Sequence, residues 1–342
     1  MLKVDITVIG GGPAGAIFAK EASKDSSVAM IYENSKKTCG GLLSEDAQKY
    51  FAERNIAIPK ELLVSPQTFA VDTIDLSQDL FCRYQRSYIN IDRKIFDEWL
   101  RDNVPNNVVK TEGHATKIER ADGGFVVHYK ENNEEKTVFS KYIVGADGAN
   151  SLVRRTFFPN KKIRSYVSIQ QSFDLVENAP YYACIFDKES TECCAWMIKK
   201  NNELLFGGAF EKKNCRESFE KMKKKLSALG ICLGKEKETE ACMVLRPESP
   251  AQICLGKDNV FLIGEAAGFI SPSSFEGISK AMYSAEALAI AMRKKNIIKS
   301  YRKSTFKLRF SILLKSVKCP FMYMPLLRKA VMKTGFTSLK LK

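Results

Sequence analysis

Three glycines near the start of the chain have the spacing of a phosphate-binding turn. Gly10, Gly12 and Gly15 fit the pattern G-x-G-x-x-G, directly after the β-branched run 4–9 and before a helical stretch. In this pattern the first glycine permits a tight turn, the second lets the backbone approach a pyrophosphate, and the third lets helix and strand pack closely. The helix that follows offers N–H groups and a positive dipole end to the phosphates. We therefore expect a dinucleotide pyrophosphate at Gly10, Gly12, Ala14 and Gly15.

An acidic residue stands where the ribose of such a ligand would lie. Glu33 follows the apolar run 28–32 and comes 18 residues after Gly15. A carboxylate at the end of the second strand accepts hydrogen bonds from ribose hydroxyls, and it argues against a 2′-phosphate there. The pattern predicts a dinucleotide with an unmodified ribose, and it leaves NAD and FAD open.

Two later segments decide between these cofactors. Residues 142–155 read as a strand, the turn Asp147-Gly148 and a helix start, and residues 261–268 read as a strand with a glycine turn. Together with residues 275–278 they resemble the DG and GD motifs of FAD-dependent proteins with the glutathione-reductase-type fold. The resemblance implies that the cofactor is FAD, and it counts Asp147 among the FAD contacts.

The same resemblance places Glu265 at the ribityl chain and Gly277 with Ile278 at the pyrimidine end of the flavin. The family normally has Asp at the position of Glu265, so the extra methylene should displace this contact slightly. A helix N-terminus at Gly277 would stabilise the negative charge that develops near N1 and the C2 carbonyl of a reduced flavin. The alternative is that Gly277 only permits a turn.

Two further segments resemble a narrower group. Residues 38–43 and 91–100 look like those of geranylgeranyl reductase-type flavoproteins, which saturate isoprenoid chains. This resemblance implies that Cys39, Gly40 and Gly41 lie beside the flavin ring and that Arg93 contacts the cofactor. It extends over nearly the whole chain to the bacterial CbrA branch of that group, through residues 84–91, 168–171, 184–187 and 263–271.

Two side chains in these segments are candidates for contact with a substrate. Cys39 would donate a proton or tune the flavin ring, or it is simply a small buried side chain. Related isoprenoid reductases have a Tyr-x-Trp-x-Phe-Pro motif in the substrate tunnel, and here residues 194–199 read Cys-Ala-Trp-Met-Ile-Lys. Trp196 remains while the other three positions have changed. It is therefore either the wall of an apolar tunnel or ordinary core.

The elements that must position these residues indicate an α/β protein. Buried runs such as 4–9, 28–32 and 141–146 read as parallel strands, and alternating segments between 166 and 209 read as an antiparallel sheet. We expect a Rossmann-like FAD-binding domain of the glutathione-reductase type, an inserted antiparallel β-sheet substrate domain and a helical C-terminal segment. The expected bounds are 1–60, 91–158 and 251–295 for the FAD-binding domain, 61–90 and 159–250 for the substrate domain, and 296–342 for the C-terminal segment.

Composition excludes several other classes. The length of 342 residues suggests about two domains, with 45% hydrophobic and 27% charged residues as in globular proteins. Ten cysteines without CxxC spacing and only two histidines, His114 and His128, argue against a metal site. Neither histidine has the neighbours of a catalytic base, which argues against a Ser–His–acid hydrolase. We find no apolar run that would span a bilayer and no signal peptide, and so expect a cytoplasmic, thiol-reduced protein.

The end of the chain is strongly basic. Lys and Arg total 54 against 39 Asp and Glu, and from Arg293 onward there are 15 basic residues and no acidic one. Phe306, Phe310, Leu313 and Val317 fall at helical spacing in this segment. A basic amphipathic helix suits an anionic membrane surface, which would make the protein peripheral on the inner face of the cell membrane. The alternative is a helical pair that caps the substrate domain. Nucleic acid is an unlikely partner because no recognition module accompanies the charge.

These expectations combine in one reaction. The resemblance implies an FAD-dependent oxidoreductase that reduces carbon–carbon double bonds of an isoprenoid (polyprenyl) lipid or another apolar small molecule. Reduced flavin would pass hydride from N5, and the proton would come from Cys39 or a bound water. No second glycine-rich motif is visible, so electrons would come from transiently bound NAD(P)H or from a protein reductant. The alternatives are a flavin monooxygenase, which shares the fold, and a non-catalytic FAD-binding protein that senses redox state or binds membranes.

Overall fold

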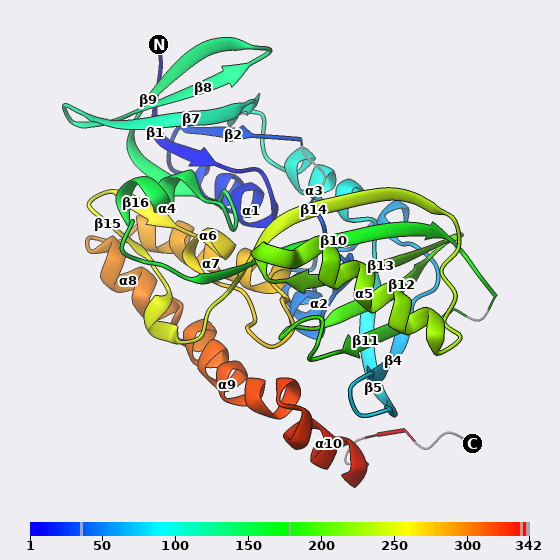
Figure 1. Ribbon diagram of the computed structural model, residues 1–342. Helices are drawn as coiled ribbons and strands as arrows, with labels where there is room; N and C mark the ends of the chain where they lie inside the picture. The colour runs from blue at the N-terminus through cyan, green and yellow to red at the C-terminus, as the bar shows by residue number, and fades with distance from the viewer. Residues whose placement is uncertain (35–36, 178, 336–337, 340–342) are drawn as a thin grey trace. The chain divides into compact units, whose positions relative to one another are not determined.

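The structure is a computed structural model that describes residues 1–34, 37–177, 179–335 and 338–339 (Figure 1). The chain forms two compact units, each built from three stretches of sequence. Unit 1 comprises Met1–Lys36, Ile95–Arg164 and Leu245–Ser316. Unit 2 comprises Lys37–Lys94, Ser165–Val244 and Val317–Lys342.

The central part of the sheet in unit 1 is parallel. Strand β1 (Leu2–Ile9) lies between β2 (Val28–Tyr32) and β9 (Glu134–Gly145), and both pairings are parallel. Strand β6 (Val109–Glu112) extends the sheet beyond β2, and β16 (Val260–Leu262) extends it beyond β9. Such runs are apolar because both faces of a parallel sheet are covered. The remaining strands of this sheet are β7 (His114–Ala121), β8 (Gly124–Glu131) and β15 (Gly256–Lys257).

The register of these strands brings their carboxyl ends to one edge. Ile9 is paired with Ile31 on β2 and with Gly145 on β9, and Gly145 is paired with Leu262 on β16. The turns that follow β1, β9 and β16 therefore meet at the same edge, which is where open α/β sheets bind ligands. The helices of unit 1 are α1 (Pro13–Ala22), α4 (Leu152–Phe157), α6 (Gly264–Ala267), α7 (Ile278–Met292) and α8 (Ile297–Ser304), with most of α3 (Arg93–Asp102) and α9 (Phe306–Tyr323).

Unit 2 contains a mostly antiparallel sheet. Its strands follow the order β14-β10-β13-β12-β11-β4-β5-β3. The pairing of β4 with β11 is parallel, which is an exception within the antiparallel sheet that the sequence predicted. The bounds are β3 (Leu42–Leu43), β4 (Thr68–Asp75), β5 (Leu80–Asn90), β10 (Arg164–Asp174), β11 (Tyr182–Phe186), β12 (Ala195–Lys200), β13 (Glu203–Phe210) and β14 (Glu236–Arg246).

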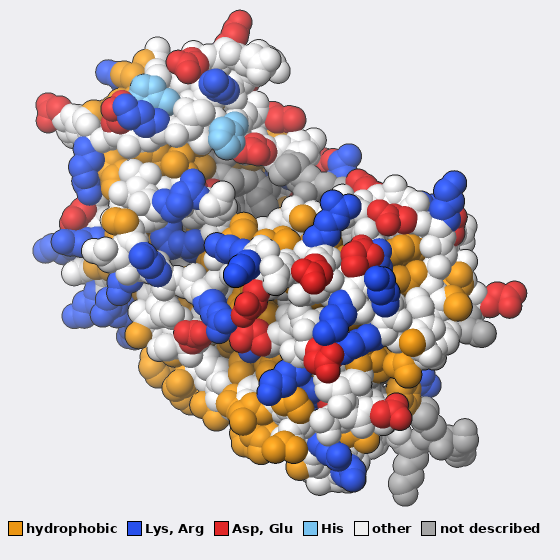
Figure 2. Space-filling model, in the orientation of Figure 1, with side chains coloured by type: hydrophobic (Ala, Val, Ile, Leu, Met, Phe, Trp, Pro, Cys, Tyr) orange, Lys and Arg blue, Asp and Glu red, His pale blue; other side chains and the backbone are white. Residues whose placement is uncertain are grey.

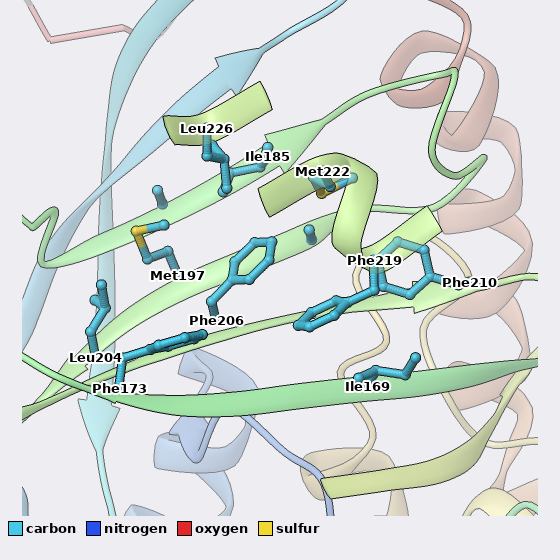
Figure 3. Packing of buried hydrophobic residues seen from close by; sticks show 12 residues of the cluster. Ile169, Phe173, Ile185, Met197, Leu204, Phe206, Phe210, Phe219, Met222 and Leu226 are labelled. Carbon is cyan, nitrogen blue, oxygen red and sulfur yellow. The ribbon is translucent and has the colours of Figure 1, made fainter. Parts of the chain in front are cut away.

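One face of this sheet is covered by the helix α5 (Cys215–Ala228). Phe219, Met222 and Leu226 of α5 are fully buried against the sheet, and Phe206 of β13 stacks on Phe219 with ring centroids 5.1 Å apart (Figure 3). Since side chains alternate across a strand, Ala195 and Met197 face this core while Trp196 points to the opposite face. The other helices of unit 2 are α2 (Glu45–Ala52) and α10 (Pro325–Thr334), with short 3₁₀ turns in the chain at Lys60–Leu62, Lys212–Asn214 and Pro250–Gln252.

The α/β fold with an inserted second sheet is confirmed. The unit boundaries differ from the expected bounds, most of all near residue 60 and in the C-terminal segment, of which residues 296–316 fall in unit 1. Residues 37–60 fall in unit 2, where β3 pairs with β5. Residues 317–342 also fall in unit 2, where α10 packs on β5. Among the described residues, no single helix is both long and apolar enough to cross a membrane. Helices α9 and α10, which meet at 89°, pass that test only as a bent pair, on length and composition.

Candidate functional site

The first glycine turn is packed on two sides and open on a third. A Cβ atom on Gly10, whose φ is +106°, would lie 2.3 Å from the carbonyl oxygen of Ala146, so the chain needs glycine there. A Cβ atom on Gly12, in contrast, would meet no atom of any described residue within 4 Å. The first N–H groups of a helix have no partner within the helix, and Gly12 has no side chain to cap those of α1. The turn thus has the shape that a pyrophosphate requires.

The three turns at the edge of the sheet touch one another. The N–H of Ala146, after β9, donates to the carbonyl oxygen of Ile9 at 2.7 Å. A Cβ atom on Gly264, after β16, would lie 2.9 Å from the Cβ of Ala14 and 3.4 Å from that of Ala281. Segments more than a hundred residues apart in the sequence therefore converge at the start of α1, as the glycine pattern predicted.

Arg154 ties the second turn to the third. Its Nη1 donates to the carbonyl oxygen of Ala266 at 2.9 Å, and its Nη2 donates to that of Ala149 at 2.5 Å. The side chain is buried, so these charge-assisted hydrogen bonds are not weakened by water. Arg154 thus fixes the two turns relative to each other.

Asp147 has one oxygen in use and one without a partner. Its Oδ2 accepts the N–H of Val153 at 3.2 Å, at the start of α4. Its Oδ1 is buried and has no hydrogen-bond partner within the described part of the chain. Burial raises the pKa of this carboxyl, which hydrogen bonds from Ser151 and Val153 only partly offset. A buried acceptor of this kind is costly unless a ligand hydroxyl satisfies it, so the residues present fit a bound FAD.

Arg101 was not identified from the sequence. It lies in the last turn of α3, is buried, and donates from Nη2 to Asn34 Oδ1 at 2.9 Å and from Nη1 to the Gly11 carbonyl at 3.4 Å. Its guanidinium lies 5.0 Å from the centre of the Tyr32 ring. Arg101 therefore holds the glycine turn against the end of β2 and places a positive charge beneath it. The only sequence signal was a basic residue on the last turn of an amphipathic helix.

Two predicted contacts have protein partners of their own. Glu33, exposed at the end of β2, contacts His114 Nδ1 through its Oε1 atom. Glu265 accepts the N–H of Leu245 on Oε1 at 3.0 Å. The extra methylene of glutamate lets this carboxylate reach the end of β14, so its predicted contact with a ribityl chain must share the group with Leu245. Both cofactor roles stay predictions.

The start of α7 carries a buried charge pair that the sequence analysis did not identify. Glu276 precedes Gly277 and accepts the N–H of Ser279 at 3.0 Å, and Lys280 donates to its other oxygen at 2.7 Å. Burial opposes ionisation of Glu276, yet Lys280 and Ser279 lower its pKa. This carboxylate partly offsets the positive end of the helix dipole. The predicted flavin contacts of Gly277 and Ile278 stay predictions, with Glu276 as an added charge beside them.

The remaining predicted residues lie in unit 2. Gly41 has φ +60° and its N–H lies 3.4 Å from Cys39 Sγ, as in a tight turn. A Cβ atom on Gly40 would lie 2.5 Å from Ile198 and 3.8 Å from the Trp196 indole. Arg93, the first residue of α3, also belongs to this unit. The roles predicted for Arg93, Cys39, Gly40 and Gly41 at the cofactor stay predictions.

Trp196 is not part of the core under α5. Its half-buried indole donates from Nε1 to Gln170 Oε1 at 3.0 Å and lies across Gly207, where a Cβ atom would be 2.7 Å from the ring. The glycines at positions 40 and 207 leave room for the ring on the face of the sheet opposite α5. Its proposed contact with substrate stays a prediction, and so does the alternative that it is ordinary core.

Lys200 secures the Gly40–Gly41 turn, and it was also missed. Its Nζ donates to Asn90 Oδ1 at 2.6 Å, to the Ile91 carbonyl at 2.7 Å and to the Gly41 carbonyl at 3.4 Å. Burial lowers the pKa of Lys200 to about 8, although Cys39 and Asp92 act to raise it. A lysine at the end of a strand looks like ordinary surface charge in a sequence, and its partners lie more than a hundred residues away.

Among the described residues, no cluster of His, Cys, Asp and Glu has a metal-binding arrangement.

Comparison with known families matches residues 106–303 to the FAD binding domain family. Protein CbrA of Escherichia coli O6:H1 is 41% identical over 341 residues, which cover 97% of this chain and 93% of that protein.

Solved structures share the fold. A geranylgeranyl bacteriochlorophyll reductase-like protein from Thermoplasma acidophilum has a TM-score of 0.82 at 18% identity, covering 97% of this chain and 90% of that one. The p-nitrophenol 4-monooxygenase from Pseudomonas putida DLL-E4 has a TM-score of 0.74 at 14% identity, covering 98% and 93%. The match to the FAD binding domain family confirms the cofactor that the DG-like and GD-like segments implied. The chain therefore belongs to the CbrA family of FAD-binding flavoproteins and is an FAD-dependent oxidoreductase.

Proposed function

We propose that this oxidoreductase reduces carbon–carbon double bonds of an isoprenoid (polyprenyl) lipid. The observation that carries the proposal is the position of Trp196, whose half-buried indole lies against Gly40 on the face of the unit 2 sheet opposite α5. An alkene has no polar group to hydrogen-bond, so an aromatic wall beside the reacting centre is the means of holding it. The reductase-like name of the Thermoplasma acidophilum protein supports the same substrate class.

In this proposal, residues of the chain bind the cofactor, orient the substrate and supply the proton. FAD, when bound and reduced, supplies the hydride. The Gly12 turn would bind the pyrophosphate, and Asp147 Oδ1 would accept a hydrogen bond from a hydroxyl of the cofactor. The Cys39 thiol, next to Gly41, would give a proton to the carbon that does not receive hydride, and a bound water is the alternative donor. Electrons would come from transiently bound NAD(P)H or from a protein reductant.

The direct test is an anaerobic incubation of the chemically reduced, FAD-loaded protein with polyprenyl lipids in detergent. The expected product carries one added pair of hydrogens for each saturated bond, detected by mass spectrometry, and the flavin is reoxidised in step. Trp196→Ala should lower the rate, while Trp99→Ala, a change at the only other tryptophan, serves as the matched control. Flavin that stays reduced with every lipid tried would contradict a reductase and favour a non-catalytic redox protein.

A flavin monooxygenase is the second candidate. The fold of p-nitrophenol 4-monooxygenase from Pseudomonas putida favours it, because the two chains align over 98% of this one. Mixing the reduced protein with isotopically labelled dioxygen and an aromatic or lipid substrate separates the two reactions. Label in the product would establish the monooxygenase, whereas product formed only without oxygen would establish the reductase.

We also propose that the protein acts as a peripheral protein at a membrane surface. A polyprenyl lipid partitions into the bilayer, so an enzyme that uses it must reach the lipid from that surface. Fractionation of cells that express the full chain should recover it with membranes at low salt and release it at high salt. Release by detergent alone would instead indicate an embedded protein.

A further inference from the structure

The exposed side of α9 is apolar along most of its length. Starting from Phe306, large apolar residues recur at positions i+4, i+7, i+8, i+11 and i+15, which lie on one side of a helix. We call this row the apolar stripe. Its members have exposed fractions between 42% and 62% and are Phe306, Phe310, Leu313, Leu314, Val317 and Phe321. Figure 2 shows hydrophobic side chains gathered where Figure 1 draws α9. A contiguous exposed row of this kind marks an interaction surface.

The chain that follows the stripe is anchored. Arg328 of α10 is buried, and its Nε donates to Asp75 Oδ2 at 2.7 Å while its Nη1 donates to the Met322 carbonyl at 2.8 Å. Its guanidinium also lies 4.7 Å from the centre of the Phe186 ring. Separating the buried Arg328–Asp75 pair would leave an uncompensated buried charge. This pair therefore holds α10 in one position within unit 2. The capping interpretation of the tail thus applies to α10, and it leaves the stripe uncovered.

The charge around the stripe has one sign. Lys307 and Lys318 are exposed and lie at i+1 and i+12 from Phe306, which places both along the same border of the stripe. From Arg293 to the end of the chain there are 15 basic residues and no acidic one. A partner for this surface must therefore present negative charge beside an apolar layer.

We propose that the apolar stripe lies on a membrane with anionic headgroups, with the axis of α9 parallel to the surface. The six apolar side chains enter the boundary between headgroups and acyl chains, and Lys307 and Lys318 contact lipid phosphates. A second copy of the chain fits less well, since two facing stripes bring lysines together with no acidic residue in the tail to pair with them. This inference deepens the peripheral association proposed above and does not depend on which lipid is reduced.

The experiment is sedimentation of the full, FAD-loaded chain with vesicles. Phosphatidylcholine vesicles that contain phosphatidylglycerol should bind the chain, pure phosphatidylcholine vesicles should bind it far less, and added salt should weaken binding. Lys307→Gln with Lys318→Gln should weaken binding about thirtyfold, because each basic side chain near the surface contributes about fivefold. The matched control is Lys24→Gln with Lys257→Gln, which removes the same charge from exposed sites outside the tail.

The apolar contribution is tested by Phe310→Ser against Phe69→Ser, a change at an exposed phenylalanine outside the stripe. Phe310→Ser should weaken vesicle binding, and Phe69→Ser should leave it unchanged. The proposal is overturned if the wild-type chain does not bind phosphatidylglycerol vesicles, or if the two phenylalanine variants bind equally. A wild-type dimer that Phe310→Ser converts to a monomer, without change in vesicle binding, would assign the stripe to a second copy. Reductase activity in detergent separates failure of this proposal from failure of the proposed function.

Discussion

Gly15 approaches Gly10 so closely that a Cβ atom on Gly15 would lie 1.8 Å from the Gly10 carbonyl oxygen. This contact sets the distance between β1 and α1, and with it the width of the turn between them. Gly12 lies in the same turn with open space on its side. Substitution of Gly15 and substitution of Gly12 should therefore have opposite consequences.

Gly12→Ala should leave the fold intact and weaken the binding of FAD. Its φ of −74° is open to alanine, and the added methyl meets no described residue, so the melting temperature of the apoprotein should not change. The methyl would occupy the space of the pyrophosphate and should weaken FAD binding at least about tenfold, roughly 1.4 kcal/mol. Fluorescence titration with FAD measures the affinity. Gly15→Ala is the contrasting variant, because it should lower the melting temperature of the apoprotein itself. Equal behaviour of the two variants would contradict this assignment of roles.

Asp147→Asn should make the apoprotein more stable relative to wild type as pH rises. Burial raises the pKa of Asp147 above its ordinary 3.8, so the folded state holds this proton more tightly than the unfolded chain. That contribution to stability is present at low pH and is lost as pH rises through the folded pKa. Denaturant unfolding of both proteins between about pH 4 and pH 7 measures the difference. A difference that does not change with pH would show that Asp147 is not buried as described.

Lys200 should hold the Gly40–Gly41 turn more firmly above about pH 8, through its hydrogen bonds to Gly41 and Ile91. The pKa of Lys200 is lowered by burial to about 8, so the folded protein releases this proton while an unfolded chain keeps it up to about 10.5. The penalty of burying a charge is therefore present below pH 8 and is relieved as pH rises, so local opening of the turn becomes less favourable across this window. Hydrogen exchange of residues 38–43, corrected for its intrinsic pH dependence, should fall across this window. In Lys200→Arg, which stays charged, it should not fall. Identical profiles would contradict the assignment.

Lys280→Met should strongly destabilise the protein. Lys280 is buried and pairs with Glu276, so its removal leaves a buried carboxylate without its counter-charge. Breaking a buried pair of this kind costs about 3–5 kcal/mol. The double variant Glu276→Gln with Lys280→Met should recover part of the loss, because the residual charge is gone. Chemical denaturation of the four proteins completes the cycle. A double variant no more stable than Lys280→Met would show that the pair does not act as described.

The parts of the site that depend on local pattern were predictable from the sequence. The glycine turn, the strands around it and the turn at Asp147 each lie within one short segment, and backbone geometry permits few alternatives there. The convergence of the turns after β1, β9 and β16 follows from parallel pairing, which the apolar runs indicated. The sequence shows Glu265 where the family normally has Asp. The consequence, a hydrogen bond from the N–H of Leu245, depends on a strand 20 residues away and could not be predicted locally.

The residues that the sequence analysis missed act through distant partners. Arg101 contacts Asn34 and Lys200 contacts Asn90, and nothing in the local sequence distinguishes either side chain from surface charge. The boundary near residue 60 was misplaced for a similar reason. With two residues, β3 is too short to be recognised as a strand from the sequence. Only its pairing with β5 assigns it to unit 2. Long-range pairings of this kind leave no periodic signal.

The most direct test of the whole account is the FAD content of the purified chain. Three turns, after β1, β9 and β16, should together hold one FAD, so loading with FAD and removal of free cofactor should leave one flavin per chain by absorbance. NAD should not compete, and Gly12→Ala should retain far less flavin than wild type at equal folded content. A correctly folded wild-type chain that stays colourless after loading at saturating FAD would contradict the account.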